Sequence, residues 1–357
     1  LREKTRTATN VERVHWDESR QQWVVSTNNG EFRAQFLIND SGPLSTPFTP
    51  DFNGRERFQG AAFHTNNWDW DYDYKGKRVA TIGSGASAAQ VIPAMANDVA
   101  EMHVFQRTPH WVLPRPDRRF SRFQRYLLGV KPMYKLLRSL IYWSLEYRVI
   151  GFKYSKTLLK LVAQRKAENF IKKTIGDPAL QKALTPDYTI GCKRIILSST
   201  LYPALDQPHV SVHTKDDGIA EINETGIRTT QGKQLDVDLI VYATGYCATD
   251  GVISYPVEGR DGRSLADQWE AYPRAYLGTS LPGFPNLFIM TGPNTGIGHT
   301  SAIFIIEAQL NYVAKAIKQV LKGGHQTVEV TEEAEVEYTE MIHREMEKTV
   351  WKSGGCN

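Results

Sequence analysis

Apolar and polar residues alternate in two short runs within the first forty positions. The runs QQWVVST and EFRAQFLIND flank the turn NNG at residues 28–30, a pattern that is typical of a β-hairpin. Residues 41–52 follow and are rich in Pro and Gly, which predicts a linker between domains. The first part of the chain therefore predicts a hairpin that leads into an interdomain connection.

The hydrophobic pattern then predicts alternating strands and helices. A buried strand is predicted at residues 77–82, an apolar helix at 87–96, and a second strand in EMHVFQRTPHWVLPRP. Leu, Tyr, Lys and Arg recur at helical spacing over residues 121–184, with helix breakers at Pro132, Gly151 and Pro178, and predict a helical insertion. Strand patterns return in GCKRIIL, VSVHT and ETGIRTTQGKQLDVDLIVYATGY. A final strand, a turn rich in Gly, Pro and Asn, a long amphipathic helix and a charged helical tail follow.

Composition places the chain among ordinary globular proteins. With 357 residues, 41% hydrophobic and 23% charged, it can form two or three domains. The net charge of +4, without a dense Lys/Arg run, gives no reason to expect a nucleic-acid partner. The three cysteines have no CxxC or zinc spacing, which favours reduced thiols and a cytoplasmic location. The most apolar helical stretch, residues 139–154, is interrupted by Glu146 and Arg148 and is not expected to span a membrane.

A glycine-rich turn lies between the strand and the helix predicted at residues 77–96. In the pattern GxGxxA, the first glycine permits a tight turn, the second lets the backbone approach a pyrophosphate, and the small third residue allows close packing. The helix N-terminus would offer free N–H groups and its positive dipole end to the phosphates. We therefore expect dinucleotide binding, and a tight turn without a ligand is the alternative. The turn residues are Gly83, Ser84, Gly85, Ala86, Ser87 and Ala88.

The residue that ends the next strand indicates which dinucleotide is bound. The strand HVFQR ends in Arg107, 24 residues after Gly83 (107 − 83). A site for NAD or FAD usually has Asp or Glu there, which accepts hydrogen bonds from the ribose hydroxyls. A guanidinium cannot accept such a bond, but it pairs with a 2′-phosphate. Arg107 therefore favours NADPH over NADH, and an ordinary surface arginine is the alternative.

The segment FQGAAFHTNNWD at residues 58–69 has little secondary-structure pattern and reads as part of a linker, yet it contains a histidine and a tryptophan. It resembles the FxGxxxHxxxW(P/D) fingerprint of the Baeyer–Villiger monooxygenases and directly precedes the NADPH-type turn. Related N-hydroxylating and flavin-containing monooxygenases have a similar string without the tryptophan, so the Baeyer–Villiger group is favoured. The matching residues are Phe58, Gly60, His64, Trp68 and Asp69.

The resemblance extends through VFQRTPHWVLPRP, GCKRIIL, IVYATGY and TGPNTGIGHTS, and is weakest in the helical insertion. It implies an α/β fold with two dinucleotide-binding, Rossmann-like domains. The chain has no second GxGxxG, so we expect a fragment without the FAD pyrophosphate turn and slightly shortened at its C-terminus. A one-domain protein in which GSGASA binds FAD is the alternative, against which Arg107 and the position of the fingerprint argue. The expected parts are 1–54 (remainder of the FAD domain), 55–116 and 191–247 (NADPH domain), 117–190 (helical insertion) and 248–357 (C-terminal part of the FAD domain).

The activity implied by the resemblance is the insertion of one oxygen atom of O2 beside a ketone carbonyl, which gives an ester or lactone. FAD and NADPH are the implied cofactors, and a small ketone and O2 the implied partners. Arg194 in GCKRIIL matches the family's active-site arginine, a permanent cation that would stabilise negative charge near the flavin. Lys193 would add a second positive contact to the 2′-phosphate. Without the resemblance, Arg194 would be read as an arginine flanking a strand.

His64 resembles a hinge residue that coordinates domain movement, rather than a base in the chemical step. A packed histidine is the alternative. Asp40-Ser41-Gly42 stands where the family has its first Ala-Thr-Gly crossing between domains, so a FAD contact there is in doubt. The resemblance implies further cofactor contacts. Thr108 beside Arg107 and the second crossing at Ala243, Thr244 and Gly245 are two of these. The others are the opening of the last helix at Gly292, Pro293 and Asn294, which would face the flavin, and Trp351, which would lie near the nicotinamide.

Two other functions remain open at this point. One is a flavin monooxygenase that oxidises the nitrogen or sulfur of an amine or sulfide. The other is an NADPH-binding remnant without catalytic activity. Within the helical insertion, aromatic residues predict either an aromatic core, which is the simpler interpretation, or a surface that touches membranes or lipophilic substrates. These residues are Tyr126, Tyr134, Trp143 and Tyr147.

Overall fold

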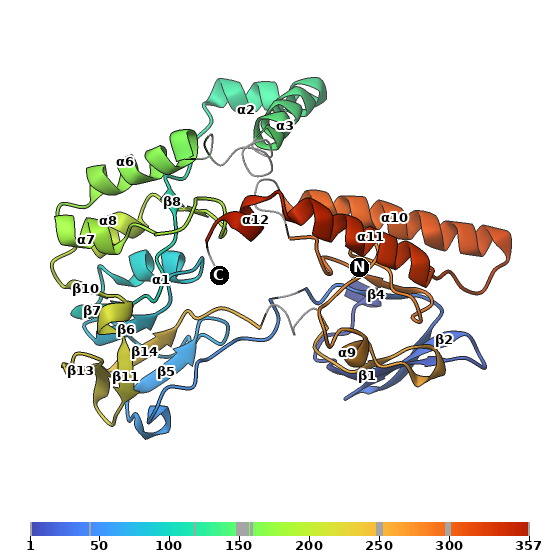
Figure 1. Ribbon diagram of the computed structural model, residues 1–357, viewed down its shortest axis with the longest axis horizontal. Coiled ribbons are helices and arrows are strands. Elements are labelled where there is room, and N and C mark those ends of the chain that lie inside the picture. Colours follow the sequence, from blue (N-terminus) through green and yellow to red (C-terminus); the bar gives the residue numbers. More distant parts are fainter. Residues whose placement is uncertain are drawn as a thin grey trace. The chain divides into compact units, whose positions relative to one another are not determined.

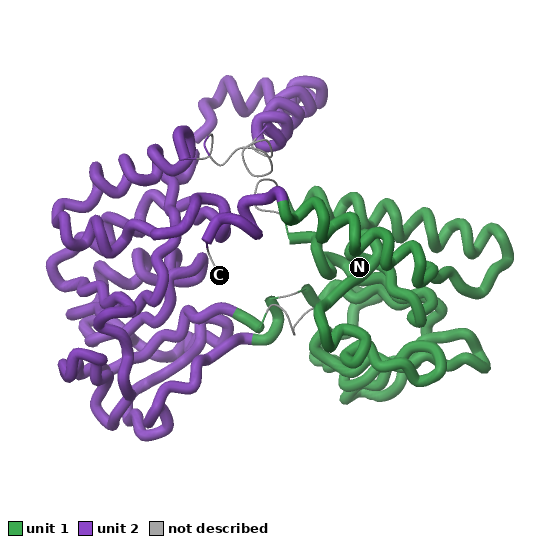
Figure 2. The backbone as a smooth tube through the Cα atoms, in the orientation of Figure 1, with its two compact units in different colours: residues 1–46, 246–347 green, residues 47–245, 348–357 purple. Residues whose placement is uncertain are grey.

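The protein is described by a computed structural model (Figure 1). Its chain forms two compact units, each with its own core (Figure 2). Unit 1 consists of residues 1–46 and 246–347, and unit 2 of residues 47–245 and 348–357. The structure describes residues 2–42, 44–117, 119–147, 157, 160–247, 253–296 and 301–355.

Unit 2 is built on a five-stranded sheet in the order β10-β7-β6-β14-β5, in which every neighbouring pair is parallel. All four residues of β14 are buried, as are four of the five residues of β6. Such continuous apolar runs are typical of parallel strands that are covered on both faces. In sheet order the strands are Val210–His213, Glu101–Phe105, Arg78–Ile82, Leu239–Tyr242 and Ala61–His64.

Helices cover one face of this sheet and a small antiparallel sheet covers the other. Ile92 and Met95 of α1 pack with Leu205 of α8 and the sheet in one core. Ile222 and Ile227 of the small sheet pack on the opposite face. The elements are α1 (Ala88–Met95), α8 (Leu201–Leu205), β11 (Ile219–Ile222), β12 (Gly226–Thr229), β13 (Gln234–Asp236) and a separate parallel pair, β8 (Val112–Leu113) with β9 (Ile196–Leu197).

The predicted helical insertion is confirmed between β8 and β9. Pro132 lies in the first turn of α3 and Pro178 in the first turn of α7, where the missing N–H group costs nothing, so each proline marks a helix start. Gly151 lies outside the described residues. The helices are α2 (Arg122–Leu128), α3 (Lys131–Glu146), α6 (Arg165–Thr174), α7 (Pro178–Ala183) and a π-helical turn at Lys160–Gln164.

The expected aromatic core of the insertion is wrong for α2 and α3. Neither helix has a buried residue. The four aromatic residues named for that core, Tyr126, Tyr134, Trp143 and Tyr147, are all exposed.

Unit 1 contains a four-stranded sheet in the order β15-β1-β2-β3. Its predicted hairpin is confirmed, because β2 and β3 pair antiparallel with Thr27 opposite Gly30. Trp16 and Trp23 lie edge to face in its core, with ring centroids 5.4 Å apart. The strands are Val257–Glu258, Val11–Asp17, Gln22–Thr27 and Gly30–Ala34.

A parallel strand pair and two long helices complete unit 1. Strand β16 (Leu287–Ile289) pairs with β4 (Leu37–Asn39). The predicted amphipathic helix is α10 (Ala302–Gly323), and the charged tail forms α11 (Glu332–Met346). Gly292, Pro293 and Asn294 do not open the helix, contrary to expectation, since α10 begins only at Ala302 with Ser301 as its N-cap. The smaller helices of unit 1 are α9 (Leu265–Gln268) and short 3-10 turns at Arg2–Lys4 and Arg260–Gly262, whereas the 3-10 turns at Arg55–Arg57 and Lys215–Asp217 belong to unit 2.

Three features differ from the expected partition of the chain. The fingerprint was read as part of a linker, but Ala61–His64 forms β5 of the unit 2 sheet. Residues 348–357 belong to unit 2, because Val350 of α12 (Val350–Ser353) is buried there and the carbonyl of Gly354 accepts a hydrogen bond from Thr189. Unit 1 extends to Thr46, beyond the first crossing expected at residues 41–42.

Two further observations concern the cysteines and the membrane. Cys192 is disulfide-bonded and Cys247 is free, so the expectation of reduced thiols is wrong for Cys192. Within the described part of the chain, no helix combines the length and the apolar character needed to cross a bilayer.

Candidate dinucleotide-binding site

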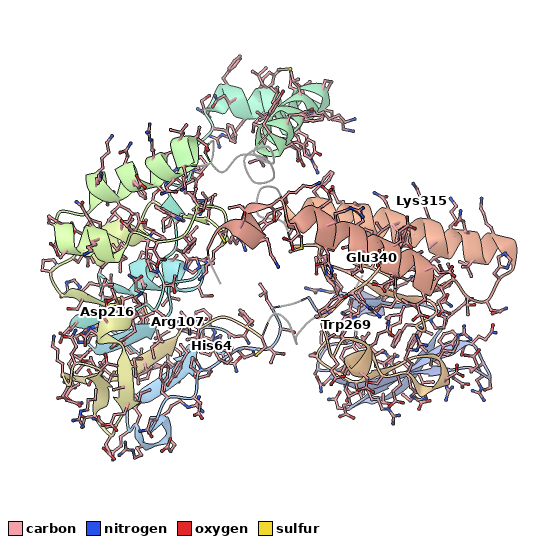
Figure 3. All side chains as sticks on the ribbon, in the orientation of Figure 1. His64, Arg107, Asp216, Trp269, Lys315 and Glu340 are labelled. Carbon is pink, nitrogen blue, oxygen red and sulfur yellow. The ribbon has the colours of Figure 1, made fainter. Side chains whose placement is uncertain are left out.

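The site lies at the carboxyl edge of the unit 2 sheet. Because the strands are parallel, the segments that follow β5, β14, β6 and β7 meet at one edge, where open α/β sheets bind their ligands. Arg107 follows β7 and His64 ends β5, and Figure 3 labels both residues.

The first glycine of the turn is required by a close backbone approach. Gly83 has φ 134°, a region that other residues rarely adopt. A Cβ atom at this position would lie 2.2 Å from the carbonyl oxygen of Ala243. The Gly83 N–H group donates to the carbonyl of Phe105 at 2.9 Å. The turn is therefore fixed between the ends of β14 and β7.

The second glycine leaves room for a ligand. No atom lies within 4 Å of the position that a Cβ of Gly85 would occupy. Ser87, the N-cap of α1, makes no side-chain capping bond, while the Ala89 N–H group donates to the Gly85 carbonyl and the Gln90 N–H group to the Ser87 carbonyl, each at 3.0 Å. Ala88, the small third residue, is buried against the sheet. These features fit a pyrophosphate at the helix N-terminus.

His110 extends the site, and the sequence did not single it out. The hydroxyl of Ser84 donates to the Thr108 carbonyl at 2.7 Å and lies 3.2 Å from Nδ1 of His110. Because the one hydroxyl proton is directed to Thr108, the imidazole Nδ1–H is the donor in the second contact, which leaves Nε2 as an acceptor. Burial, with a contribution from the charge of Lys193, lowers the pKa of His110. The string TPH directly after Arg107 was the available sequence signal.

Lys193 lies over an aromatic platform. Its Nζ is 5.2 Å from the ring centroid of Tyr188, within the range of a cation–π interaction. The Tyr188 hydroxyl donates to the Pro109 carbonyl at 3.2 Å, and Nε1 of Trp111 donates to the Tyr188 carbonyl at 2.8 Å. Burial raises the pKa of Tyr188 to about 12. Tyr188 thus joins the lysine to the loop that contains Thr108 and His110.

Two arginines of the site have free guanidinium groups. The side chains of Arg107 and Arg194 are both exposed to solvent. Among the described residues, neither has a carboxylate within ion-pair distance, whereas other arginines of unit 2, such as Arg78 with Asp238 at 2.8 Å, are paired. Exposed cations without a partner are suited to bind an anionic ligand.

Two of the crossings between the units, near residues 46–48 and 244–247, are hydrogen-bonded to each other. The Phe48 N–H group donates to the Gly245 carbonyl at 2.9 Å, and the Thr244 hydroxyl donates to the Phe48 carbonyl. The Cys247 N–H group donates to Thr46 at 3.0 Å. Two of the three positions at which the chain passes from one unit to the other, after Thr46 and after Gly245, lie in this pair of segments. Ala243, Thr244 and Gly245 therefore form a connection next to the Gly83 turn.

His64 is buried beside this connection. The Asn66 N–H group donates to Nδ1 of His64 at 3.0 Å, so the neutral ring carries its proton on Nε2. Burial lowers the pKa of His64, and a backbone hydrogen bond with Gly245 opposes that shift. This arrangement links the end of β5 to the crossing at Gly245.

The other fingerprint residues have structural partners. The Phe58 ring lies where a Cβ of Gly60 would be, at 2.4 Å, so the glycine permits the phenylalanine to fold back. Trp68 packs edge to face on Phe63, with centroids 4.8 Å apart. The Asp69 carboxylate accepts a hydrogen bond from the Asp71 N–H group at 3.0 Å and closes a turn.

The remaining expected contacts lie in different parts of the chain. Trp351 packs against the buried cluster of Trp111, Tyr188 and Val350 in unit 2. Gly292, Pro293 and Asn294 belong to unit 1, where a Cβ at Gly292 would lie 2.5 Å from the Gly278 carbonyl. Their contacts with the nicotinamide and the flavin stay predictions.

Comparison with known proteins identifies what this arrangement resembles. Residues 4–258 match the family described as flavin-binding monooxygenase-like. A Baeyer-Villiger monooxygenase of Pseudomonas aeruginosa is 43% identical over the whole chain, which covers 67% of that protein. A Baeyer-Villiger monooxygenase of Streptomyces coelicolor is 40% identical, with 100% and 68% coverage. The crystal structure of OTEMO in complex with FAD and NADP superposes with a TM-score of 0.89 at 26% identity, covering 100% of this chain and 74% of that one.

The two glycines of the turn are expected to respond differently to alanine. Gly83→Ala should lower the free energy of unfolding by at least about 2 kcal/mol, because its Cβ would meet the Ala243 carbonyl. Gly85→Ala should leave stability nearly unchanged but weaken NADPH binding, because its Cβ points into open space. Denaturant unfolding and NADPH titration of both variants measure the two effects. Equal stability of the two variants would contradict the structure of the turn.

Tyr188 is expected to influence the selection of NADPH through Lys193. Tyr188→Leu removes the ring face and should lower NADPH affinity by roughly 3- to 30-fold, whereas NADH affinity should change little. Tyr188→Phe keeps the ring and should retain most of the selectivity. The ratio of the two dissociation constants is the readout, since a loss of stability alone would weaken both coenzymes alike. The same ratio in Tyr188→Leu as in the unsubstituted protein would refute this role.

His64 is expected to make stability depend on pH. Its pKa in the folded state is lowered, so the neutral ring is favoured, and its contribution is complete above the unfolded pKa of about 6.5. That contribution is lost as the pH falls from about 6.5 toward the lower folded pKa. His64→Asn retains an acceptor near the Nδ1 position but does not titrate, so its Tm should fall less between pH 7 and 5. His325→Asn, at an exposed position, is the control. Parallel Tm curves for all three proteins would exclude this role of His64.

Proposed function

The chain belongs to the flavin-binding monooxygenase-like family, and from this premise we propose that it catalyses Baeyer–Villiger oxidation with FAD and NADPH. In this reaction one oxygen atom of O2 is inserted beside the carbonyl of a ketone, giving an ester or lactone. Two relatives at 40–43% identity that are named for this activity support the proposal. FAD, when bound, supplies the oxygen chemistry and NADPH the hydride.

One observation carries the NADPH part of the proposal. The strand–turn–helix has an open second glycine at the end of β6, and cationic side chains without carboxylate partners follow it at the same sheet edge. We assign the pyrophosphate to the first turn of α1 and the 2′-phosphate to Arg107 and Lys193. Thr108 holds Ser84 through its carbonyl, and His110 offers a neutral imidazole beside the lysine.

Arg194 is assigned to the reaction centre by position. It neighbours Lys193 in the chain, lies two residues before β9, and is exposed. A fixed cation near the reacting atoms stabilises negative charge that develops during oxygen insertion, without any proton transfer. His64 is assigned no proton transfer with substrate, because its Nδ1 accepts from Asn66 and its ring is buried at the crossing.

Two segments of the chain are assigned to contact FAD. Gly292, Pro293 and Asn294 follow β16, and the crossing at Ala243, Thr244 and Gly245 follows β14, so both groups stand at carboxyl ends of parallel strands. Gly292 can approach another backbone closely, as it does with Gly278, and Gly296 has no atom within 4 Å of a Cβ position. These are suitable positions for a flat polar ring system to contact backbone groups.

The proposal is tested with two substrates and one matched pair of variants. With FAD, NADPH and O2, the protein should convert cyclohexanone to its lactone faster than it converts thioanisole to the sulfoxide. Arg107→Ala should raise the KM for NADPH by about 10- to 100-fold with a smaller change in kcat, because a charged hydrogen-bond partner of the 2′-phosphate is lost. Arg115→Ala, an exposed arginine on the following loop, is the control.

Each component can fail separately. Sulfoxide as the sole product would show the heteroatom-oxidising class, the second candidate. NADPH affinity that is unchanged in Arg107→Ala would refute the assignment of the 2′-phosphate. A protein that holds FAD, as shown by absorbance, and binds NADPH but converts neither substrate would be a coenzyme-binding module without catalytic activity.

A further inference from the structure

Helices α2 and α3 form an apolar surface that the proposed function does not use. Both belong to unit 2, and neither contains a buried residue. Large side chains that usually stay out of water are exposed on both, including Phe123 and Tyr126 of α2. An exposed apolar patch of this kind marks an interaction surface in a folded protein.

Apart from Tyr134 and Ile141, the exposed large apolar residues of α3 and its C-cap form one continuous stripe. They are separated alternately by three and four positions, so they lie on one face of the helix. Their exposed fractions range from 42% to 72%. Tyr147 continues the line because its backbone is still helical. The stripe consists of Met133, Leu136, Leu140, Trp143 and Tyr147.

The segment that contains this stripe, residues 119–147, has six cationic residues and only one acidic residue. At 100° per residue, Lys131, Lys135 and Arg138 lie on the face of α3 opposite the stripe. The only acid between residues 119 and 147 is Glu146. The cations of the segment are Arg119, Arg122, Arg125, Lys131, Lys135 and Arg138.

We propose that α2 and α3 dock on the surface of an anionic phospholipid bilayer. A helix with aromatic and aliphatic residues on one face and Lys and Arg on the other is typical of helices that lie in the membrane interface. The stripe would enter the boundary between headgroups and acyl chains, and the cations would attract the anionic headgroups. With 16 residues, α3 is about 24 Å long and too short to span the hydrocarbon core of about 30 Å, so it lies on the membrane.

Charge argues against a second copy of the chain as the occupant. A symmetric contact through α3 would bring two groups of cations together, with one glutamate on each side to offset them. The positions that flank the stripe, Leu137, Ser139 and Ser144, offer no opposite charges of the kind that pair helices in a coiled coil. An anionic bilayer offers acyl chains to the apolar stripe and negatively charged headgroups to the cations.

Vesicle co-sedimentation tests the proposal. The 357-residue protein should bind vesicles of phosphatidylglycerol and phosphatidylcholine and bind pure phosphatidylcholine at least about tenfold more weakly, with the difference reduced at high salt. Leu140→Ser/Trp143→Ser should reduce binding to the anionic vesicles by at least about tenfold. Lys131→Glu/Lys135→Glu should have a similar effect at low salt. Trp70→Ser, which changes an 88%-exposed tryptophan elsewhere in unit 2, should bind as the unsubstituted protein does.

Folding and coenzyme binding are measured on the same samples. The variants should retain Tm and NADPH affinity, because α2 and α3 contribute no buried residue and are not part of the dinucleotide site. No binding to anionic vesicles by the folded protein would overturn the proposal. So would sedimentation as an oligomer that Leu140→Ser/Trp143→Ser dissociates, since a second copy would then cover the stripe. Failure of NADPH binding would instead count against the proposed function alone.

Discussion

The close approach of the Gly83 backbone to the Ala243 carbonyl is the constraint on which the site depends. A Cβ at residue 83 would lie 2.2 Å from that oxygen, so the phosphate turn after β6 and the crossing after β14 can occupy the same space only with glycine there. This contact fixes where α1 begins and therefore where its N–H groups point. The same crossing is hydrogen-bonded to Phe48, which ties the coenzyme turn to the position where the chain enters unit 2.

The role that we assign to His64 follows from its position beside this crossing. It ends β5, the edge strand beside β14, and it is buried next to Gly245 rather than presented to substrate. The neutral ring carries its proton on Nε2, so it presents a defined donor between the crossing and the end of β5. A movement of the crossing would therefore be felt at this edge of the sheet through His64. Conformational steps limit many multidomain enzymes, and a buried group at the crossing is placed to affect them. Trp68 and Asp69 support this end of the sheet through packing and a turn, respectively.

The sequence was most informative where the determinants are local. The GxGxxA turn, the hairpin with its two-residue connection and the NADPH-type Arg107 follow from residues close to one another in the chain, and the turn and hairpin are present in the structure. Strand β5 was missed because it is a four-residue edge strand with only His64 buried, and it owes its form to pairing with a strand more than 170 positions away. The place of residues 348–357 in unit 2 depends likewise on the distant contact of Thr189 with Gly354. Tyr188 and His110 were missed because a cation–π platform and a serine contact have no spacing rule that a single sequence reveals.

We propose that the carboxyl edge of the unit 2 sheet selects the 2′-phosphate of NADPH. The most direct measurement uses only that part of the coenzyme, by calorimetric titration of the protein with 2′,5′-ADP and with 5′-AMP at the same ionic strength. We expect 2′,5′-ADP to bind at least about tenfold more tightly, since hydrogen bonds to charged groups contribute about 1.5–3 kcal/mol each. This advantage should shrink as salt is added. Equal affinity for the two nucleotides at low salt would show that this edge of the sheet does not select the 2′-phosphate.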